Sequence, residues 1–345
     1  MSYEEEMKGS FLSPYKIVKP YMNKQMPQTV EVHIAYQCNF NCEWCIDKHH
    51  METGTNQDRT SMLTEGGVRE IIQFCLQTGV NGIIISGGGE PALTKSTELL
   101  IKKAKYHNIT IGMFTNGSIM PYETMKIYID NLTFLRFSVD DFDAEHYSKT
   151  KGVPIQIYDA VLENIKRCTD YKRESGNTTC RIGIDFVIKP DNIERLVDMY
   201  FECINLKVDY IEFCDCVIPG YDFTESTRKK IEEKLNSILW YKNIRIDEID
   251  VAYEPIRKEN TTLCKDCLVK DYIVQVGADG LVRPCPFLSR RNDLAYGSIY
   301  KDRMFNIWNN RPKKLDTDLL YENCRFIKQN EILKGLDYIS HEEMI

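Results

Sequence analysis

The chain has 345 residues, 43% of them hydrophobic and 28% charged, proportions that are typical of a globular protein. At about 150 residues per domain, this length accommodates one large domain or two modest ones. The 44 Lys and Arg against 51 Asp and Glu give a net charge of −7, which argues against a nucleic-acid partner. No apolar run approaches the roughly 20 residues that cross a bilayer, and residues 1–7 lack the apolar core of a signal peptide. We therefore expect a cytoplasmic protein without a membrane partner.

The chain contains 13 cysteines, an odd number in a sequence long enough to fold without disulfide staples. In an intracellular protein, clustered cysteines indicate metal or redox chemistry rather than disulfide bridges. One cluster lies near residue 40 and a second lies beyond residue 260. Cys75, Cys168 and Cys203 instead fall on the apolar faces of expected helices, where core packing is their expected role.

Taken in chain order, the elements begin after residues 1–27, a polar, proline-containing stretch that we expect to be a surface extension. From residue 28, short apolar strands alternate with helices of 3.6-residue periodicity. The expected strands cover 30–34, 83–85, 109–114, 134–139, 182–188 and 210–217, and the expected helices cover 68–75, 99–104, 125–129, 161–168 and 196–204. This alternation predicts an α/β fold over residues 28–217, with a parallel sheet and helices outside it.

The alternation stops after residue 217. A charged amphipathic helix over 225–240 and a short strand over 244–251 are expected in a linker that covers residues 218–255. From residue 256 to residue 345, cysteine, glycine and proline return in a loop-rich stretch. We expect this last segment to form a small second domain.

The first cysteine cluster directly follows the first expected strand. Cys38, Cys42 and Cys45 form a C-x3-C-x2-C pattern on one short loop. Three thiolates can hold three irons of a [4Fe–4S] cluster and leave the fourth iron without a protein ligand. A zinc site with His49 or His50 as fourth ligand is the alternative, because zinc also accepts three cysteines and one histidine.

A second motif, Ser86-Gly87-Gly88-Gly89-Glu90-Pro91, ends the next expected strand. It matches neither the dinucleotide-binding nor the P-loop glycine pattern. Glycines let a ligand approach the backbone closely, and the carboxylate of Glu90 can receive an ammonium group. This motif therefore predicts a ligand site beside the cysteine loop.

Together the two motifs resemble those of the radical S-adenosylmethionine (SAM) superfamily, over roughly residues 28–217. The resemblance implies a partial (β/α)6 TIM-like barrel and a [4Fe–4S] cluster whose open iron chelates SAM. An electron, supplied by a cellular donor such as flavodoxin or ferredoxin, would cleave SAM to methionine and a 5′-deoxyadenosyl radical that abstracts hydrogen from substrate. The resemblance also implies contacts with SAM. Trp44 would lie near the adenine, and Gly88, Gly89 and Glu90 near the methionyl ammonium. Thr115, Asn116 and Ser138 would help to hold the nucleoside.

The alternation of side chains along two strands supports the barrel independently. Leu135, Phe137 and Val139 alternate with polar residues, among them Arg136 and Ser138, and residues 181–188 show the same pattern. In a barrel with outer helices the apolar set faces the helices and the polar set faces the lumen. A polar lumen suits a polar substrate. The alternative is the solvated face of an ordinary open sheet.

The second cluster comprises Cys264, Cys267, Cys285 and Cys324, with Gly280 five residues before Cys285. Its spacing resembles the SPASM/Twitch extensions of radical SAM enzymes, which bind an auxiliary [4Fe–4S] cluster. A β-hairpin over 273–276 and 280–282, with its turn at 278–280, fits that resemblance, as does the segment 297–308. A zinc ribbon would use the same four ligands and is the alternative to an iron–sulfur cluster.

If only Cys264, Cys267 and Cys285 were ligands, one iron of the auxiliary cluster would stay open, as in radical SAM enzymes of the molybdopterin pathway. Those enzymes carry arginines at the positions of Leu268-Val269-Lys270, so their specific activity is not expected here.

These features predict a radical SAM oxidoreductase or isomerase with two [4Fe–4S] clusters. Residues 1–27 are too short for the recognition domain common in peptide-modifying relatives, so a small polar substrate is expected: a sugar, aminocyclitol or nucleotide-linked sugar. A peptide-modifying maturase and a zinc-stabilised binding protein without catalysis are the alternatives.

On the last expected strand, Glu212, Cys214 and Cys216 should face the lumen, at the end where barrel active sites are built. A thiol there could return a hydrogen atom in an epimerisation, and Glu212 or Asp185 could be the base of a dehydrogenation.

Overall fold

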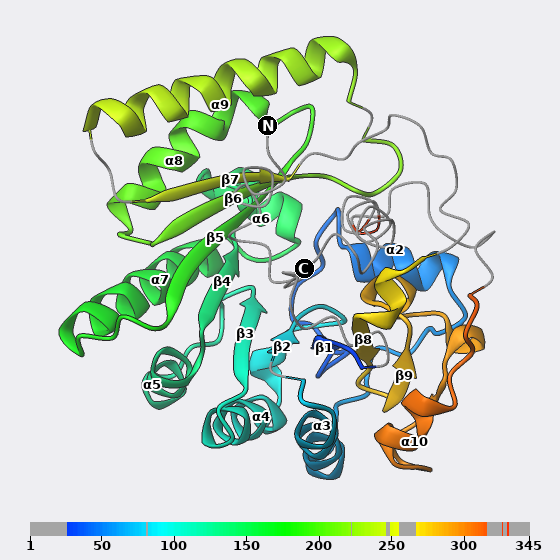
Figure 1. Cartoon of the computed structure of the whole chain (residues 1–345). Coiled ribbons are helices and arrows are strands. Elements are labelled where there is room, and N and C mark those ends of the chain that lie inside the picture. Colours follow the sequence, from blue (N-terminus) through cyan, green and yellow to red (C-terminus); the bar gives the residue numbers. More distant parts are fainter. Residues whose placement is uncertain are drawn as a thin grey trace, which may run out of the picture.

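The computed structural model describes residues 26–80, 82–221, 223–245, 249–254, 267–315, 326 and 330. Its strands join into one ten-stranded sheet, in the order β10-β9-β8-β1-β2-β3-β4-β5-β6-β7 (Figure 1). The residues predicted as an extension lie almost entirely outside the described part. None of the described helices combines the length and the apolarity that a bilayer crossing needs.

The first seven strands run parallel and neighbour one another in chain order. They are β1 Thr29–Val32, β2 Gly82–Ile85, β3 Thr110–Thr115, β4 Phe134–Ser138, β5 Arg181–Ile188, β6 Tyr210–Asp215 and β7 Asp250–Glu254. The six predicted parallel strands are thereby confirmed. A seventh comes from the stretch interpreted as a linker, so that the barrel sheet extends beyond residue 217.

The predicted C-terminal hairpin is confirmed, and it belongs to the same sheet. Strand β8 (Ile273–Val276) pairs parallel to β1, and β9 (Leu281–Arg283) pairs antiparallel to β8. A short β10 (Gly297–Ser298) follows. Gly280 adopts a φ of 75° in the hairpin turn, where its amide donates to the Gly277 carbonyl. The hairpin therefore extends the barrel sheet past β1.

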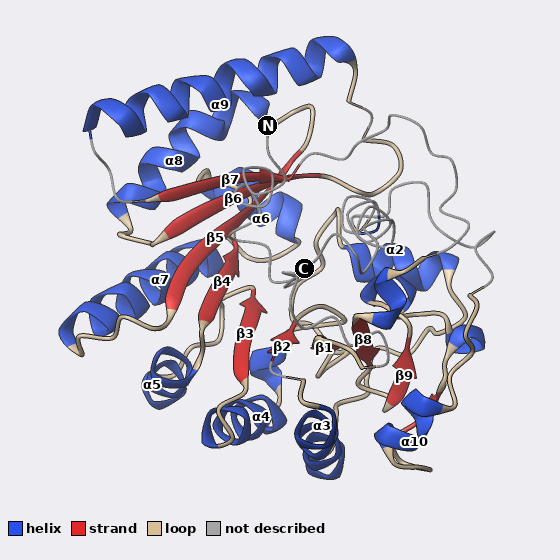
Figure 2. Ribbon diagram, viewed as in Figure 1, coloured by secondary structure: helices blue, strands red, loops and turns tan. Residues whose placement is uncertain are grey.

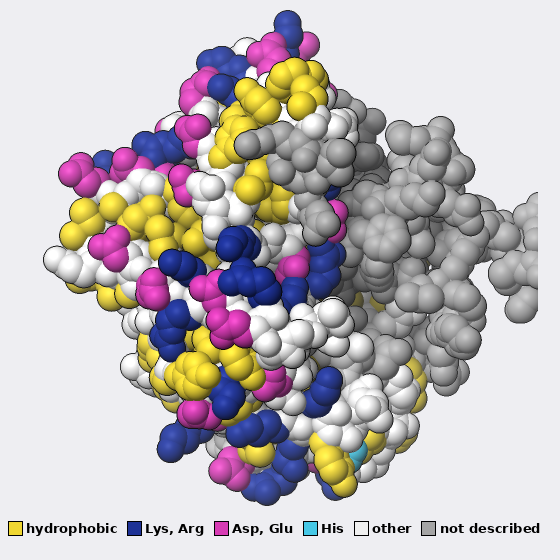
Figure 3. Space-filling model, turned by 90° about the vertical axis from the view of Figure 1, so that its left-hand side faces the viewer, with side chains coloured by type: hydrophobic (Ala, Val, Ile, Leu, Met, Phe, Trp, Pro, Cys, Tyr) yellow, Lys and Arg dark blue, Asp and Glu magenta, His cyan; other side chains and the backbone are white. Residues whose placement is uncertain are grey.

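Helices cover the convex side of the curved sheet (Figure 2). The outer layer consists of α3 Glu65–Thr78, α4 Lys95–Tyr106, α5 Tyr122–Asn131, α7 Gln156–Glu174, α8 Leu196–Asn205 and α9 Glu225–Arg245. Three further helices are α2 Ile46–Thr53, α6 Ala144–Lys151 and α10 Met304–Asn309. The sequence analysis missed α2 and α6. On the face of the molecule in Figure 3, acidic and basic side chains are interspersed.

Helix α9 and strand β7 differ in their bounds from the prediction. The helix continues to Arg245, and the strand predicted from residue 244 begins at Asp250. Ile231 and Ile238 are buried, and Tyr241 packs against the same core. The helical spacing of these buried residues continues past Trp240, and Ile244 lies in the helix with an exposed side chain.

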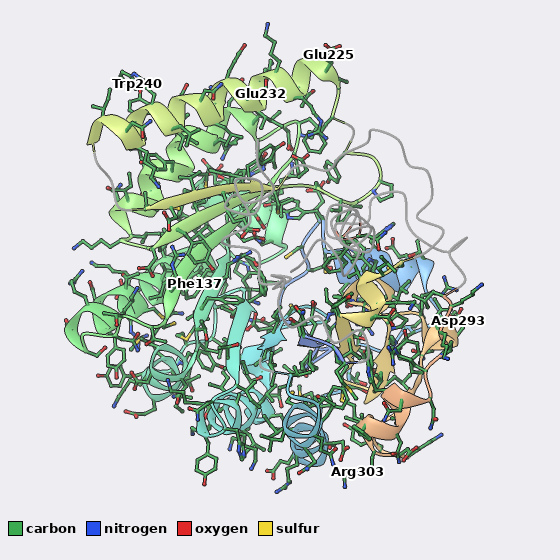
Figure 4. All side chains as sticks on the ribbon, viewed as in Figure 1. Phe137, Glu225, Glu232, Trp240, Asp293 and Arg303 are labelled. Carbon is green, nitrogen blue, oxygen red and sulfur yellow. The ribbon has the colours of Figure 1, made fainter. Side chains whose placement is uncertain are left out.

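The core lies between the sheet and the outer helices. The predicted apolar set, which includes Phe137 and Ile184, is buried there. Figure 4 labels Phe137 among the side chains of this region. The alternate residues face the opposite, concave side, where Arg136 contacts Tyr210 and Glu212. The predicted alternation is thus confirmed for β4 and β5.

Two glycines let large rings occupy the concave face of the sheet. Gly112 pairs with Phe134, and Gly183 pairs with Tyr210. A Cβ at Gly183 would lie 2.1 Å from the Tyr210 ring, and one at Gly112 would lie 1.9 Å from the Phe134 ring. The two rings and Arg136, whose guanidinium lies within 6 Å of both ring centroids, fill this part of the barrel.

We expect Gly183→Ala to lower the free energy of unfolding by about 1–3 kcal/mol, because the added methyl group overpacks Tyr210. Gly66→Ala is the matched control. Gly66 is exposed in the first turn of α3, and the nearest atom to an added Cβ is 3.6 Å away. Alanine there should raise stability by up to about 1 kcal/mol. Urea denaturation measures both, and equal stability of the two variants would contradict the packing argument.

Candidate iron–sulfur and SAM site

The cysteine loop, residues 35–45, follows β1 and leads into α2. Cys38 is exposed, and Cys42 and Cys45 are half-buried. Cys45 is the N-cap residue of α2, at the end of the helix dipole that stabilises a thiolate. The backbone N–H of Phe40 donates to Cys38 Sγ at 3.4 Å. The loop therefore presents three thiols together with groups that favour negatively charged sulfur.

Burial raises the pKa of all three thiols: to about 12 for Cys38, to about 11 for Cys42, and above its usual value for Cys45. Neighbouring thiols raise the pKa of Cys38 and Cys42 further. A metal centre displaces these protons, because a metal-bound thiol is deprotonated. The loop thus fits an iron–sulfur cluster with three cysteine ligands. Among the described side chains, no three potential ligands are gathered closely enough to hold a single metal ion.

The zinc alternative needs a histidine beside the cysteines. His50 is buried, its Nδ1 lies 3.5 Å from Ser289 Oγ, and its ring packs edge-on against Phe287. These contacts direct His50 towards the C-terminal segment. They argue against His50 as a zinc ligand.

The glycine-rich loop, Ser86–Pro91, packs directly on the cysteine loop. The Glu90 amide donates to the Gln37 carbonyl at 2.9 Å. A Cβ at Gly89 would lie 2.1 Å from that oxygen, and Gly88 adopts a φ of 91°. The close approach that these glycines allow is therefore to the protein backbone, whereas their contact with SAM stays a prediction.

Glu90 joins two predicted SAM-binding loops. Its buried carboxylate accepts hydrogen bonds from the Thr115 hydroxyl and the Asn116 amide, both at 2.7 Å, and from the Ala92 amide at 3.0 Å. Burial raises the pKa of this carboxyl, and the three donors oppose that rise. The Asn116 side chain in turn donates to Asn39 Oδ1 at 2.9 Å. The loops after β1, β2 and β3 are thus connected, and a Glu90 contact with a methionyl ammonium stays a prediction.

Trp44 and Ser138 lie on the β4 side of the site. The buried indole of Trp44 donates to Asp140 Oδ2 at 3.3 Å, and Lys189 Nζ lies 3.9 Å from its ring centroid. Half-buried Ser138 accepts a hydrogen bond from Lys151 Nζ through its carbonyl oxygen at 2.9 Å. The predicted adenine and nucleoside contacts of Trp44 and Ser138 thus lie beside a buried cluster of Lys151, Lys189 and Asp140.

Two of the predicted catalytic residues, Asp185 on β5 and Glu212 on β6, lie beside Arg136 on the concave face. Arg136 Nη2 lies 2.6 Å from Glu212 Oε2, and Nη1 lies 4.0 Å from Asp185 Oδ1. Cys214 Sγ lies 3.9 Å from the same Asp185 oxygen. Cys216 is also buried, and burial raises the pKa of its thiol to about 11. Glu212, Asp185 and Cys214 are thus brought together.

Of the second cysteine cluster, Cys264 and Cys324 lie outside the described residues. Cys285 belongs to a buried apolar cluster with Phe287 and Phe326, against which Cys267 packs. The hydroxyl of Tyr296 is buried and has no hydrogen-bond partner within the described part of the chain. These residues are therefore compatible with the predicted auxiliary cluster.

Sequence reasoning missed the pair that joins the two cysteine regions. Arg290 Nε and Nη2 donate to the two carboxylate oxygens of Asp47, at 2.9 and 2.5 Å, and both side chains are buried. The guanidinium also stacks on the Tyr36 ring, 3.7 Å from its centroid. Its Nη1 donates to the Asp58 carbonyl. No spacing signal connects Asp47 with a residue 243 positions away.

The fold and this site define a partial (β/α) barrel with a thiol loop after its first strand. Residues 32–203 match the family model described as Radical SAM superfamily. This part of the chain is a radical SAM domain.

Curated proteins are also similar to this chain. A probable GTP 3′,8-cyclase of Methanococcus aeolicus is 26% identical over 284 residues, which cover 78% of this chain and 88% of the relative. A GTP 3′,8-cyclase of Staphylococcus aureus is 27% identical over 227 residues, 64% of this chain. The aligned part spans 63% of the staphylococcal protein, less than two thirds of its length.

Solved structures share the fold. Streptococcus suis SuiB bound to S-adenosylmethionine has a TM-score of 0.65 at 17% identity, with 84% of this chain and 67% of that chain covered. Native anSMEcpe with bound AdoMet has a TM-score of 0.64 at 15% identity, with 88% of each chain covered. At these identities the likeness is one of fold.

We expect Arg290→Met to lower the free energy of unfolding by about 3–5 kcal/mol, because it leaves Asp47 buried without its cation. Arg69→Met is the control. Arg69 pairs with Glu65 on α3, where the two side chains are 61% and 70% exposed, so its loss should cost less than about 1 kcal/mol. Guanidinium denaturation of both variants measures the difference. Equal losses would show that the Asp47 pair does not carry the contact between the two regions.

Proposed function

We propose that this protein is a radical SAM oxidoreductase or isomerase that acts on a small polar substrate and carries two [4Fe–4S] clusters. The observation that supports it most is the placement of Cys38, Cys42 and Cys45 on one loop, in hydrogen-bonded contact with the glycine-rich loop. In this proposal they ligate the first cluster, and Cys264, Cys267, Cys285 and Cys324 ligate the auxiliary one. A flavodoxin or ferredoxin in the cytoplasm would supply the electron.

When bound, the first cluster supplies the electron that cleaves SAM to methionine and a 5′-deoxyadenosyl radical. The protein's own residues position SAM and the substrate. Glu90 fixes the glycine-rich loop relative to Thr115 and Asn116, and Trp44 is fixed by Asp140. Together these contacts hold rigid the surfaces assigned to the methionyl and nucleoside parts.

Two outcomes of hydrogen abstraction follow from residues on the last strands. Because burial raises the pKa of Cys216 to about 11, its thiol stays protonated at neutral pH and can return a hydrogen atom in an epimerisation. Asp185 and Glu212 lie around Arg136 and can accept the proton lost in a dehydrogenation. We favour dehydrogenation, because an auxiliary cluster is an available electron acceptor.

GTP cyclisation, the activity named for the two curated relatives, is the second candidate. This candidate is supported by sequence similarity over 284 and 227 residues respectively.

We expect Cys45→Ala to lose about four of about eight irons and all reductive SAM cleavage, because it removes a ligand of the SAM-binding cluster. Cys285→Ala should lose the other four irons, retain formation of 5′-deoxyadenosine and lose product. Cys75→Ala, in the helix core, is the cysteine control and should keep all the iron. Iron, zinc and sulfide analysis with a dithionite cleavage assay gives the readout. Zinc in both sites, or cleavage by Cys45→Ala, would overturn the assignment.

We expect Cys216→Ala to cleave SAM and form product at the wild-type rate, with no solvent deuterium in the product, if the reaction is an oxidation. Cys214→Ala, on β6 itself, serves as the comparison, since Cys216 is the residue that follows this strand. Turnover in deuterated buffer, followed by mass spectrometry of the product, measures both. Loss of deuterium incorporation in either variant, with cleavage retained, would establish epimerisation instead.

A further inference from the structure

A group of polar side chains lies on β1 and β8 and directly after β1 and β2, and its contacts are not among those of the site described above. Glu31 and Gln275 are register partners of the parallel β1–β8 pair, so their side chains share one face of the sheet. That face is the concave one, because Glu31 is also the register partner of Ile84, which packs with Phe114 and Phe134. His33 lies two residues after Glu31 on the same face, with its Nε2 3.3 Å from Glu31 Oε1.

This polar group adjoins the glycine-rich loop. The Ser86 hydroxyl donates to Glu31 Oε1. A Cβ at Gly87 would lie 3.8 Å from His33 Cε1, so the imidazole lies directly beneath the loop. We call Glu31, His33, Ser86 and Gln275 the polar quartet.

The polar quartet contains buried hydrogen-bonding atoms without partners. Gln275 is fully buried, and neither its Nε2 nor its Oε1 has a partner within the described part of the chain. His33 Nδ1 is in the same state. A buried polar group without a hydrogen-bond partner destabilises the fold. The other residues of β8 are isoleucine and valine, so an apolar side chain also fits the surroundings of Gln275. An apolar side chain would therefore suit the ligand-free fold better than this amide.

The charge around the polar quartet restricts the ligand. On this face the guanidinium of Arg283, the register partner of Gln275, lies 2.6 Å from the carboxylate of Asp279. Its Nε is a buried donor without a partner within the described part of the chain. Glu31 adds a second carboxylate, so the carboxylates outnumber the guanidinium beside the polar quartet. A neutral or cationic ligand is favoured, and it must both donate to His33 Nδ1 or Gln275 Oε1 and accept from Gln275 Nε2.

We propose that the polar quartet binds the hydroxyl- or amino-bearing, uncharged or cationic part of the substrate. The identification of this ligand as the substrate rests on the proposed radical function, whereas the binding itself does not. Hydroxyl groups both donate and accept, so they satisfy all three unpaired atoms of the polar quartet. A phosphate or carboxylate does not bind at this position.

The test is thermal unfolding of the anaerobically reconstituted protein with glucosamine, glucose or glucose 6-phosphate as probe. Glucosamine and glucose should raise the Tm of the wild type, and glucose 6-phosphate should not. Gln275→Met should raise the ligand-free Tm by about 2 °C, because it removes the unpaired amide, and should weaken glucosamine binding at least tenfold. Gln275→Leu repeats the test with a branched side chain. Gln73→Met, on the exposed face of α3, should change neither quantity.

A lower ligand-free Tm in both Gln275 variants would show that the amide is structural and would overturn the proposal. So would tighter binding of glucose 6-phosphate than of glucosamine, or no shift with any probe. SAM cleavage, assayed in the same samples, separates the two proposals. Gln275-dependent binding without any SAM cleavage refutes the radical function and leaves the binding site standing, whereas cleavage without probe binding refutes the site alone.

Discussion

The rest of the structure depends on one buried ion pair, Arg290 with Asp47. Asp47 lies two residues after Cys45, and Arg290 lies five residues after Cys285, so the pair links both cysteine regions. A buried charge requires its partner, because an unpaired one costs several kcal/mol. The same arginine accepts hydrogen bonds from the Thr55 and Asn56 amides through its carbonyl oxygen. The C-terminal segment and the start of α2 are thereby fixed in position.

The cysteine loop is also held in two other places. Asn41 and Glu43 donate through their amides to the carbonyls of Lys151 and Thr150 at the end of α6, and Asn39 bonds to Asn116. A loop fixed in these places keeps its thiols at constant separation. Ligands that are already positioned bind a metal centre without a further loss of conformational entropy.

The sequence was most informative where a local pattern repeats. The alternation in β4 and β5 predicted which face is apolar, and apolar runs located the six parallel strands. Helix α6 carried signals that went unused, since Asp143 caps its start and Gly152 follows its end with a φ of 64°. The end of α9 was placed too early because Ile244 also suits a strand.

Contacts between distant residues could not be predicted in this way. No spacing relates Asp47 to Arg290, and the role of Gly88 and Gly89 in packing against Gln37 appears only in three dimensions. Gln275 gave a signal of another kind, as a lone amide within an apolar strand, Ile273–Val276. The place of Gln275 beside Glu31 follows from the register of β8 with β1, which the sequence does not reveal.

The most direct measurement of the central claim is the electron paramagnetic resonance spectrum of the dithionite-reduced protein, recorded before and after addition of SAM. The account predicts a reduced iron–sulfur signal whose g values shift when SAM is added, because one iron of the first cluster has no protein ligand. A protein that contains zinc in place of iron, or an iron–sulfur spectrum that SAM leaves unchanged, would contradict the account.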